Sequence, residues 1–179
     1  EVAIINGIYS TSSSGALNAC SLIINTGAKL TINELNPVTI QNDLTVNVNG
    51  TLDILDKGSL VMVNDGGIVK NNGTTTVHRF TTPFKKFDYV YWSTPVSATA
   101  ITTTVFPGWT VASSFKYVPT KSWALATTMV PANGYIIMVP SDVTLSEAVF
   151  TGKVNNGIQK VMGVVPASSY LLGNPYPSA

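Results

Sequence analysis

The stretch from Leu22 to Val77 reads LIINTGAKLTINELNPVTIQNDLTVNVNGTLDILDKGSLVMVNDGGIVKNNGTTTV and decides the fold of this chain. Short segments recur along it, most with apolar residues at their first and third positions, which is the alternation of a β-strand. Their starts lie eight residues apart, with one interval of six, at Leu22, Leu30, Val38, Leu44, Leu52, Leu60 and Ile68. Asn, Asp and Gly fill the gaps, and these residues favour tight turns. The stretch is therefore an internal repeat of one strand and one corner.

Two architectures accommodate this repeat: an antiparallel meander of hairpins, and a parallel β-solenoid with three short strands in each coil of about 24 residues. Asn49-Gly50 favours a hairpin turn, but the segment 34–37 offers no hairpin chemistry. Asn-Gly corners recur along the stretch and favour the solenoid, which we predict. Leu22 should then stack with Leu44 and Ile68. The residues expected to point inward in stacked rows are Leu30, Ile32, Leu44, Val46, Leu52, Ile54, Leu60 and Met62.

The segments outside the repeat follow other patterns. Val2–Tyr9 reads as a first pair of strands around Asn6-Gly7, and Ser10–Gly15 as a flexible loop. An aromatic strand at Phe87–Pro95 has the highest β propensity of the chain. Longer, irregularly spaced segments with many prolines follow it and predict an antiparallel sandwich or a jelly-roll-like domain. These further candidate strands are Ala100–Phe106, Ser114–Val118, Ser122–Ala126, Gly134–Val139, Ala148–Lys153, Gly157–Val164 and Tyr170–Leu172.

We therefore predict an all-β protein with an N-terminal parallel β-solenoid, or β-helix-like region, at residues 1–80. An antiparallel β-sandwich-like region at residues 81–179 should share one core with it. Apolar residues make up 45% of the chain and charged residues only 11%, which is typical of an extracellular β-protein with a Thr-, Ser- and Asn-rich surface. The net charge of +1, with scattered acids and bases, argues against a nucleic-acid partner. No apolar run reaches the roughly 20 residues of a membrane helix, so we expect no membrane insertion.

The sequence offers little for catalysis. His78 is the only histidine and Cys20 the only cysteine, so a histidine-based metal cluster or an internal disulfide is not expected. His78 should face outward from a strand or cap the solenoid, and Cys20 should be a small buried residue. Acids near the predicted corners should hydrogen-bond to turn backbone, although calcium at a corner remains open; they are Asp43, Asp53, Asp56 and Asp65. We predict no catalytic residue, no metal site and no cofactor.

Aromatic side chains are the one candidate binding feature, because exposed aromatic rings pack on the apolar faces of sugar rings. Trp92 and Tyr135 lie in strong strands and are expected in the core. Trp109 and Trp123 follow turn-forming or polar dipeptides and are expected to be exposed. We therefore take Trp109, Trp123 and Tyr117 as candidate ligand-binding residues.

The order of several motifs resembles a segment found in large secreted surface proteins of Bacteroidota, especially flavobacteria. The motifs are ACSLIINTGAKLTI at 19–32, GSLVMVND at 58–65, DYVYWSTPV at 88–96, NGYI at 133–136 and GNPYP at 173–177. The resemblance covers nearly the whole chain. It implies an adhesin-like protein outside the cell, exported by the type IX secretion system, and it brings no catalytic residues with it. The sorting domain that those proteins carry at their C-terminus is not seen here.

These features lead us to expect a non-enzymatic segment of a secreted cell-surface protein that serves adhesion or surface display. Its partners would be the type IX secretion machinery during export and surface glycans or neighbouring chains afterwards. The alternative is a carbohydrate-binding module of a secreted polysaccharide-degrading enzyme, and a glycoside-active β-helix with clustered acids is a further rival. We also expect the chain to be a piece of a longer protein, with an open strand edge that pairs with a neighbour.

Overall fold

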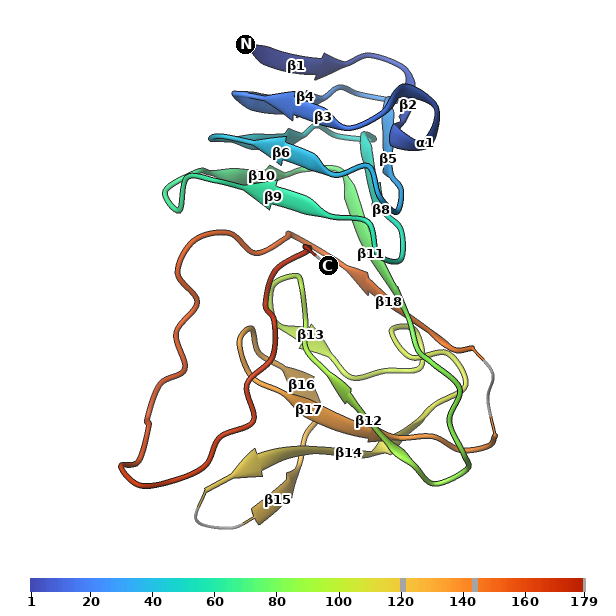
Figure 1. The fold of residues 1–179 in the computed structure, drawn as a ribbon, viewed down its shortest axis with the longest axis vertical. Coiled ribbons are helices and arrows are strands. Elements are labelled where there is room, and N and C mark those ends of the chain that lie inside the picture. Colours follow the sequence, from blue (N-terminus) through green and yellow to red (C-terminus); the bar gives the residue numbers. More distant parts are fainter. Residues whose placement is uncertain (120–121, 143–144, 179) are drawn as a thin grey trace.

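The computed structural model describes residues 1–119, 122–142 and 145–178. Its N-terminal part is a parallel β-solenoid of three coils and part of a fourth (Figure 1). The first sheet contains β1 (Val2–Ile5), β4 (Ser21–Ile24), β7 (Leu44–Val46) and β10 (Val69–Asn71). The second contains β2 (Ile8–Ser10), β5 (Lys29–Ile32), β8 (Thr51–Ile54) and β11 (Thr74–Phe80). The third contains β3 (Leu17–Ala19), β6 (Val38–Ile40) and β9 (Leu60–Met62).

The predicted rows of stacked apolar residues are confirmed, with one error of register. Leu22 pairs with Leu44, 22 residues later, and Leu30 pairs with Leu52. All the residues expected to point inward are buried except Met62, which is half-buried. The third member of the first row is Val69, not Ile68, which is 55% exposed. The corner after β9 contains two glycines, and it places Val69 25 residues after Leu44, whereas Leu44 lies 22 residues after Leu22; we expected about 24 residues for each coil.

Asparagine side chains join the corners of successive coils. Asn47 Nδ2 donates to Asn25 Oδ1 at 3.0 Å, and Asn25 Nδ2 donates to Asn6 Oδ1 at 2.6 Å. At another corner Asn42 receives a bond from the next coil and donates to Cys20 Sγ at 3.2 Å. Cys20 is thus a half-buried corner residue, and the prediction that it lies in the core is wrong. These ladders satisfy polar groups at positions where the strands end.

The first coil differs from our expectation in two respects. β1 and β2 do not form a pair, because each pairs in parallel with a strand of the next coil, in different sheets. The segment expected to be a flexible loop contains α1 (Thr11–Ser14), a single turn. Thr11 is fully buried, and its Oγ1 accepts a hydrogen bond of 2.8 Å from the backbone N–H of Asn33. This bond holds the segment against the end of β5.

The C-terminal part is an antiparallel, sandwich-like region. Its larger sheet has the order β12 (Tyr89–Trp92), β17 (Tyr135–Met138), β14 (Thr110–Val118) and β15 (Ser122–Leu125), and its smaller sheet pairs β13 (Thr99–Ala100) with β16 (Thr128–Met129). β18 (Glu147–Thr151) pairs antiparallel with β11 and so extends a sheet of the solenoid. Three predicted strands are wrong. Ala100–Phe106 is mostly turn, Gly157–Val164 is irregular, and Tyr170–Leu172 contributes one isolated bridge, between Leu172 and Asn133.

One hydrophobic cluster runs through both parts of the chain. Its link is Val77, which lies between Ile54 of the solenoid and Phe150 of β18; all three are fully buried. Phe150 in turn packs edge-to-face on Phe106 at 5.8 Å between ring centroids. A substitution that loosens the packing of the coils should therefore also lower the stability of the sandwich-like region.

The segment 155–178 meets the last coil near both of its ends and loops down beside the sandwich-like region in between (Figure 1). Asn156 Nδ2 donates to the carbonyls of Asn64 and Gly67 at 3.0 and 2.9 Å. Asn155 Nδ2 holds the segment together by donating to the carbonyl of Pro175 at 2.7 Å. In the described part of the chain, no helix is long and apolar enough to cross a membrane.

Candidate functional site

Trp109 does not belong to an exposed binding face. It is only 5% exposed, its Nε1 donates to Ser146 Oγ at 2.6 Å, and its ring packs edge-to-face on Trp92 at 5.5 Å. The expectation that Trp109 is exposed is therefore wrong. The turn before it ends with a hydrogen bond from the Trp109 N–H to the carbonyl of Phe106, which directs the indole into the core. Trp92 and Tyr135 are buried, as we predicted.

Trp123 and Tyr117 lie together on the surface of the larger sheet. They are directly paired across β14 and β15, so their side chains lie on the same face. Their rings meet edge-to-face, with centroids 5.6 Å apart and planes at 81°. Trp123 is 41% exposed. The two rings form an open corner that presents apolar ring surface to solvent.

Further aromatic residues lie beside the rings of Tyr117 and Trp123 and form a shallow hollow with them. Tyr91 reaches it from β12, where it alternates with buried Val90 and Trp92 and is 68% exposed. Tyr170 reaches it from the C-terminal segment, with its hydroxyl accepting a bond of 2.5 Å from the N–H of Val165. We call this the aromatic hollow, of about 180 Å³, lined by Tyr91, Tyr117, Trp123, Ser169, Tyr170 and Leu171.

Sequence reasoning missed Tyr91 and Tyr170 for different reasons. The alternation in β12 was visible, and Trp92 facing inward implies that Tyr91 faces outward. No signal links Tyr170 to the hollow, because its position depends on the long irregular segment that leads to it.

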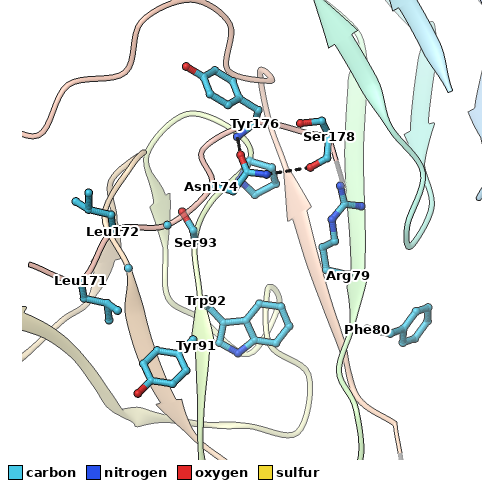
Figure 2. A pocket seen from close by; sticks show the side chains of 13 residues that line it. Arg79, Phe80, Tyr91, Trp92, Ser93, Leu171, Leu172, Asn174, Tyr176 and Ser178 are labelled. Carbon is cyan, nitrogen blue, oxygen red and sulfur yellow. Dashed lines mark hydrogen bonds between the residues drawn. The ribbon is translucent and has the colours of Figure 1, made fainter.

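A second hollow lies at the junction of the two regions (Figure 2). We call it the junction hollow. It has a volume of about 370 Å³, and its lining includes Arg79, Ser93, Leu171, Asn174 and Ser178. Asn174 is fixed by local bonds: its Nδ2 donates to the carbonyl of Ser178 at 3.1 Å, and its Oδ1 accepts from the N–H of Tyr176 at 3.0 Å (Figure 2).

Arg79 is the charged group of the junction hollow, and backbone carbonyls occupy its guanidinium. Nη1 donates to the carbonyls of His78 and Leu55 at 2.8 and 3.2 Å. Nη2 donates to those of Pro177 and Gly58 at 3.1 and 3.4 Å. Burial lowers the pKa of Arg79, and the nearby carboxylate of Asp56 partly offsets this. Arg79 thus ties the last corner of the solenoid to the C-terminal segment.

His78 lies between two carboxylates on the outer face of the solenoid. Its Nδ1 is 2.5 Å from Glu147 Oε1, and its Nε2 is 3.0 Å from Asp53 Oδ1. Asp53 also pairs with Lys29 Nζ at 3.0 Å. These contacts connect side chains of β5, β8, β11 and β18, and so they link the solenoid to β18. No group of three or more His, Cys, Asp or Glu able to hold a metal occurs among residues 1–119, 122–142 and 145–178.

Two of the acids assigned to corners make the expected backbone contacts. Asp43 Oδ1 accepts from the N–H of Ile68 at 2.8 Å, and Asp56 Oδ1 accepts from the N–H of Phe80 at 2.9 Å. Asp53 instead faces His78 and Lys29. Each of these three acids is thus accounted for by the fold.

The chain was compared with protein families, with curated proteins and with solved structures. The model of a family described as a domain of unknown function, DUF8693, matches residues 1–179. Comparisons with curated proteins and with solved structures give no match.

Proposed function

We propose that this chain, which belongs to the DUF8693 family along its whole length, is a non-enzymatic segment of a secreted bacterial cell-surface protein. It serves adhesion or surface display, and it leaves the cell through the type IX secretion system. The motifs that resemble secreted surface proteins of Bacteroidota support the location and the export route.

The observation that carries this proposal is the stack of parallel coils, together with an aromatic hollow that lies on the sandwich-like region, at the end of the molecule away from the first coil. Each coil pairs with the next in register, and the Asn ladders join their corners, so the stack is a stiff spacer. Figure 1 places β1 at one end of the long axis and β14 and β15, which carry Tyr117 and Trp123, at the other. A stiff spacer with exposed aromatic residues at its tip suits a protein that holds a ligand away from a surface.

The contacts of His78 support the non-enzymatic part of the proposal. Both ring nitrogens face carboxylates that join neighbouring strands, so the described polar contacts of the imidazole are structural. A histidine that activates a nucleophile needs one nitrogen directed at that nucleophile.

Protease treatment of intact cells tests the proposal. An antibody against this segment should stain intact source cells, and external protease should remove the signal while a cytoplasmic marker stays intact. In a strain without the type IX secretion machinery the protein should remain inside and resist the protease. Protection of the protein in intact wild-type cells would contradict the proposal.

A second candidate function is a carbohydrate-binding module of a secreted polysaccharide-degrading enzyme, and the paired rings of Tyr117 and Trp123 favour it. The full-length gene discriminates between the two functions. A catalytic domain in the same protein favours the module, whereas further repeats and a sorting domain favour the surface protein.

A further inference from the structure

The two hollows are neighbours that share part of their walls. Tyr91 and Leu171 line both the aromatic hollow and the junction hollow. Tyr91 comes from β12 and Leu171 from the C-terminal segment, so the shared wall is made of two segments 80 residues apart. A ligand that fills the aromatic hollow and continues past Tyr91 enters the junction hollow.

The chemistry of the shared lining selects a neutral ligand with apolar faces and many hydroxyl groups. The exposed rings of Trp123 and Tyr91 and the half-buried ring of Tyr117 supply apolar surface, and each of these side chains also carries a polar group that can form a hydrogen bond. The charged group in the lining of the two hollows is Arg79, and four backbone carbonyls occupy its guanidinium. An anionic ligand would therefore find no free countercharge among these lining residues.

The sizes of the hollows favour a chain of small units over one compact molecule. The aromatic hollow, at about 180 Å³, is smaller than the roughly 300–1,000 Å³ of pockets that enclose a drug-sized ligand. It accommodates one ring and leaves the rest of a larger ligand outside. The junction hollow, at about 370 Å³, offers space for the units that follow.

We propose that the aromatic hollow and the junction hollow form one binding track for a neutral oligosaccharide. One sugar ring packs against Trp123 and Tyr117, and the chain crosses Tyr91 toward Asn174 and Ser178. The inference deepens the proposed function and rests on it, since it names the class of ligand that an adhesive segment would hold.

Calorimetric titration with soluble oligosaccharides tests the track. The probes are gluco-, xylo- and manno-oligosaccharides of one to six rings, added to the purified chain. At least one series should bind, and its affinity should rise from one ring to about four. Trp123→Ala and Tyr91→Ala should each weaken binding about tenfold or more, because both remove a central aromatic contact.

Two further variants separate the hollows from the rest of the sheet. Ser178→Trp adds bulk to the junction hollow and should weaken the longer oligomers while leaving mono- and disaccharide binding unchanged. Tyr89→Ala is the matched control, because Tyr89 is also an exposed tyrosine of β12 but lies outside both linings. It should bind like the wild type, and circular dichroism should show that all four variants are folded.

Three results would overturn the inference. They are no binding of any series, binding unaffected by Trp123→Ala and Tyr91→Ala, or equal affinity for one ring and for six. Binding of extended peptides in place of sugars would overturn it as well. None of these results bears on the protease test of intact cells, so the track can fail while the surface location stands.

Discussion

Leu52→Ala tests the stacked core of the coils and its connection to the sandwich-like region. Leu52 is fully buried in β8 and lies between Leu30 and Thr75 in the row of side chains. The substitution removes three carbon atoms, worth about 0.8 kcal/mol each in transfer free energy. A cavity adds to this, because the ladders on both sides prevent the walls from closing. We expect a loss of about 3–4 kcal/mol in the free energy of unfolding, within the range of about 2–5 kcal/mol for such changes.

Urea unfolding, followed by tryptophan fluorescence and by far-ultraviolet circular dichroism, measures this loss of stability and shows whether it extends to the sandwich-like region. All three tryptophans lie between residues 92 and 123, outside the coils, so their fluorescence reports on the sandwich-like region. Because Val77 joins the two parts of the core, fluorescence and far-ultraviolet circular dichroism should shift together. Val61→Ala is the control, since Val61 on β9 is 38% exposed and should cost less than about 0.5 kcal/mol. A loss below about 1 kcal/mol, or an unchanged fluorescence transition, would refute the reasoning.

Four further changes have expected outcomes. Arg79→Ala leaves carbonyls of the last corner and of the C-terminal segment without a donor and should cost about 1–3 kcal/mol in urea unfolding; an unchanged midpoint would contradict the structural role of Arg79. Gly73→Ala places a Cβ against the backbone carbonyl oxygens of Gly50 and Asn47 and should lower the melting temperature, whereas Gly7→Ala meets open space and should not; equal melting temperatures for the two variants would contradict the close packing at Gly73. Trp109→Ala should cost about 3–5 kcal/mol, as expected of a buried tryptophan, and a loss as small as that of a surface substitution would argue against its burial. Burial raises the pKa of the Tyr135 hydroxyl in the folded protein. Its contribution to the free energy of unfolding is therefore present below the unfolded pKa of about 10 and is lost as the pH rises through the folded pKa. Tyr135→Phe should reduce the loss of stability at alkaline pH, and a dependence of stability on pH identical to that of the wild type would contradict this.

Much of the solenoid was predictable because its residues repeat. Leu22, Leu44 and their neighbours return at a nearly constant interval, so register follows from counting. The error at Ile68 arose because the corner before β10 is longer than the earlier corners. Ile68 and Val69 are both apolar, so the pattern alone does not show which of the two points inward. The repeat therefore predicts the stacked residues of the central coils more reliably than those of the last coil.

The binding surface was only partly predictable. Trp123 and Tyr117 come from two strands joined by a short connection, so their pairing is local. The direction of Trp109 depends on a core shared with Trp92 and Phe106, which no local pattern reveals. Tyr170 approaches Tyr91 only through the path of the C-terminal segment, which is irregular although the sequence predicted strands in it.

Attachment of cells tests the adhesive function most directly. Source cells that lack the gene should attach poorly to surfaces coated with the oligosaccharide that binds the purified chain. Re-expression of the wild-type protein or of Tyr89→Ala should restore attachment, whereas a Tyr91→Ala, Trp123→Ala double variant should reach the cell surface without restoring it. Equal attachment of deletion and wild-type cells, or full rescue by the double variant, would contradict the proposed adhesion through the aromatic hollow.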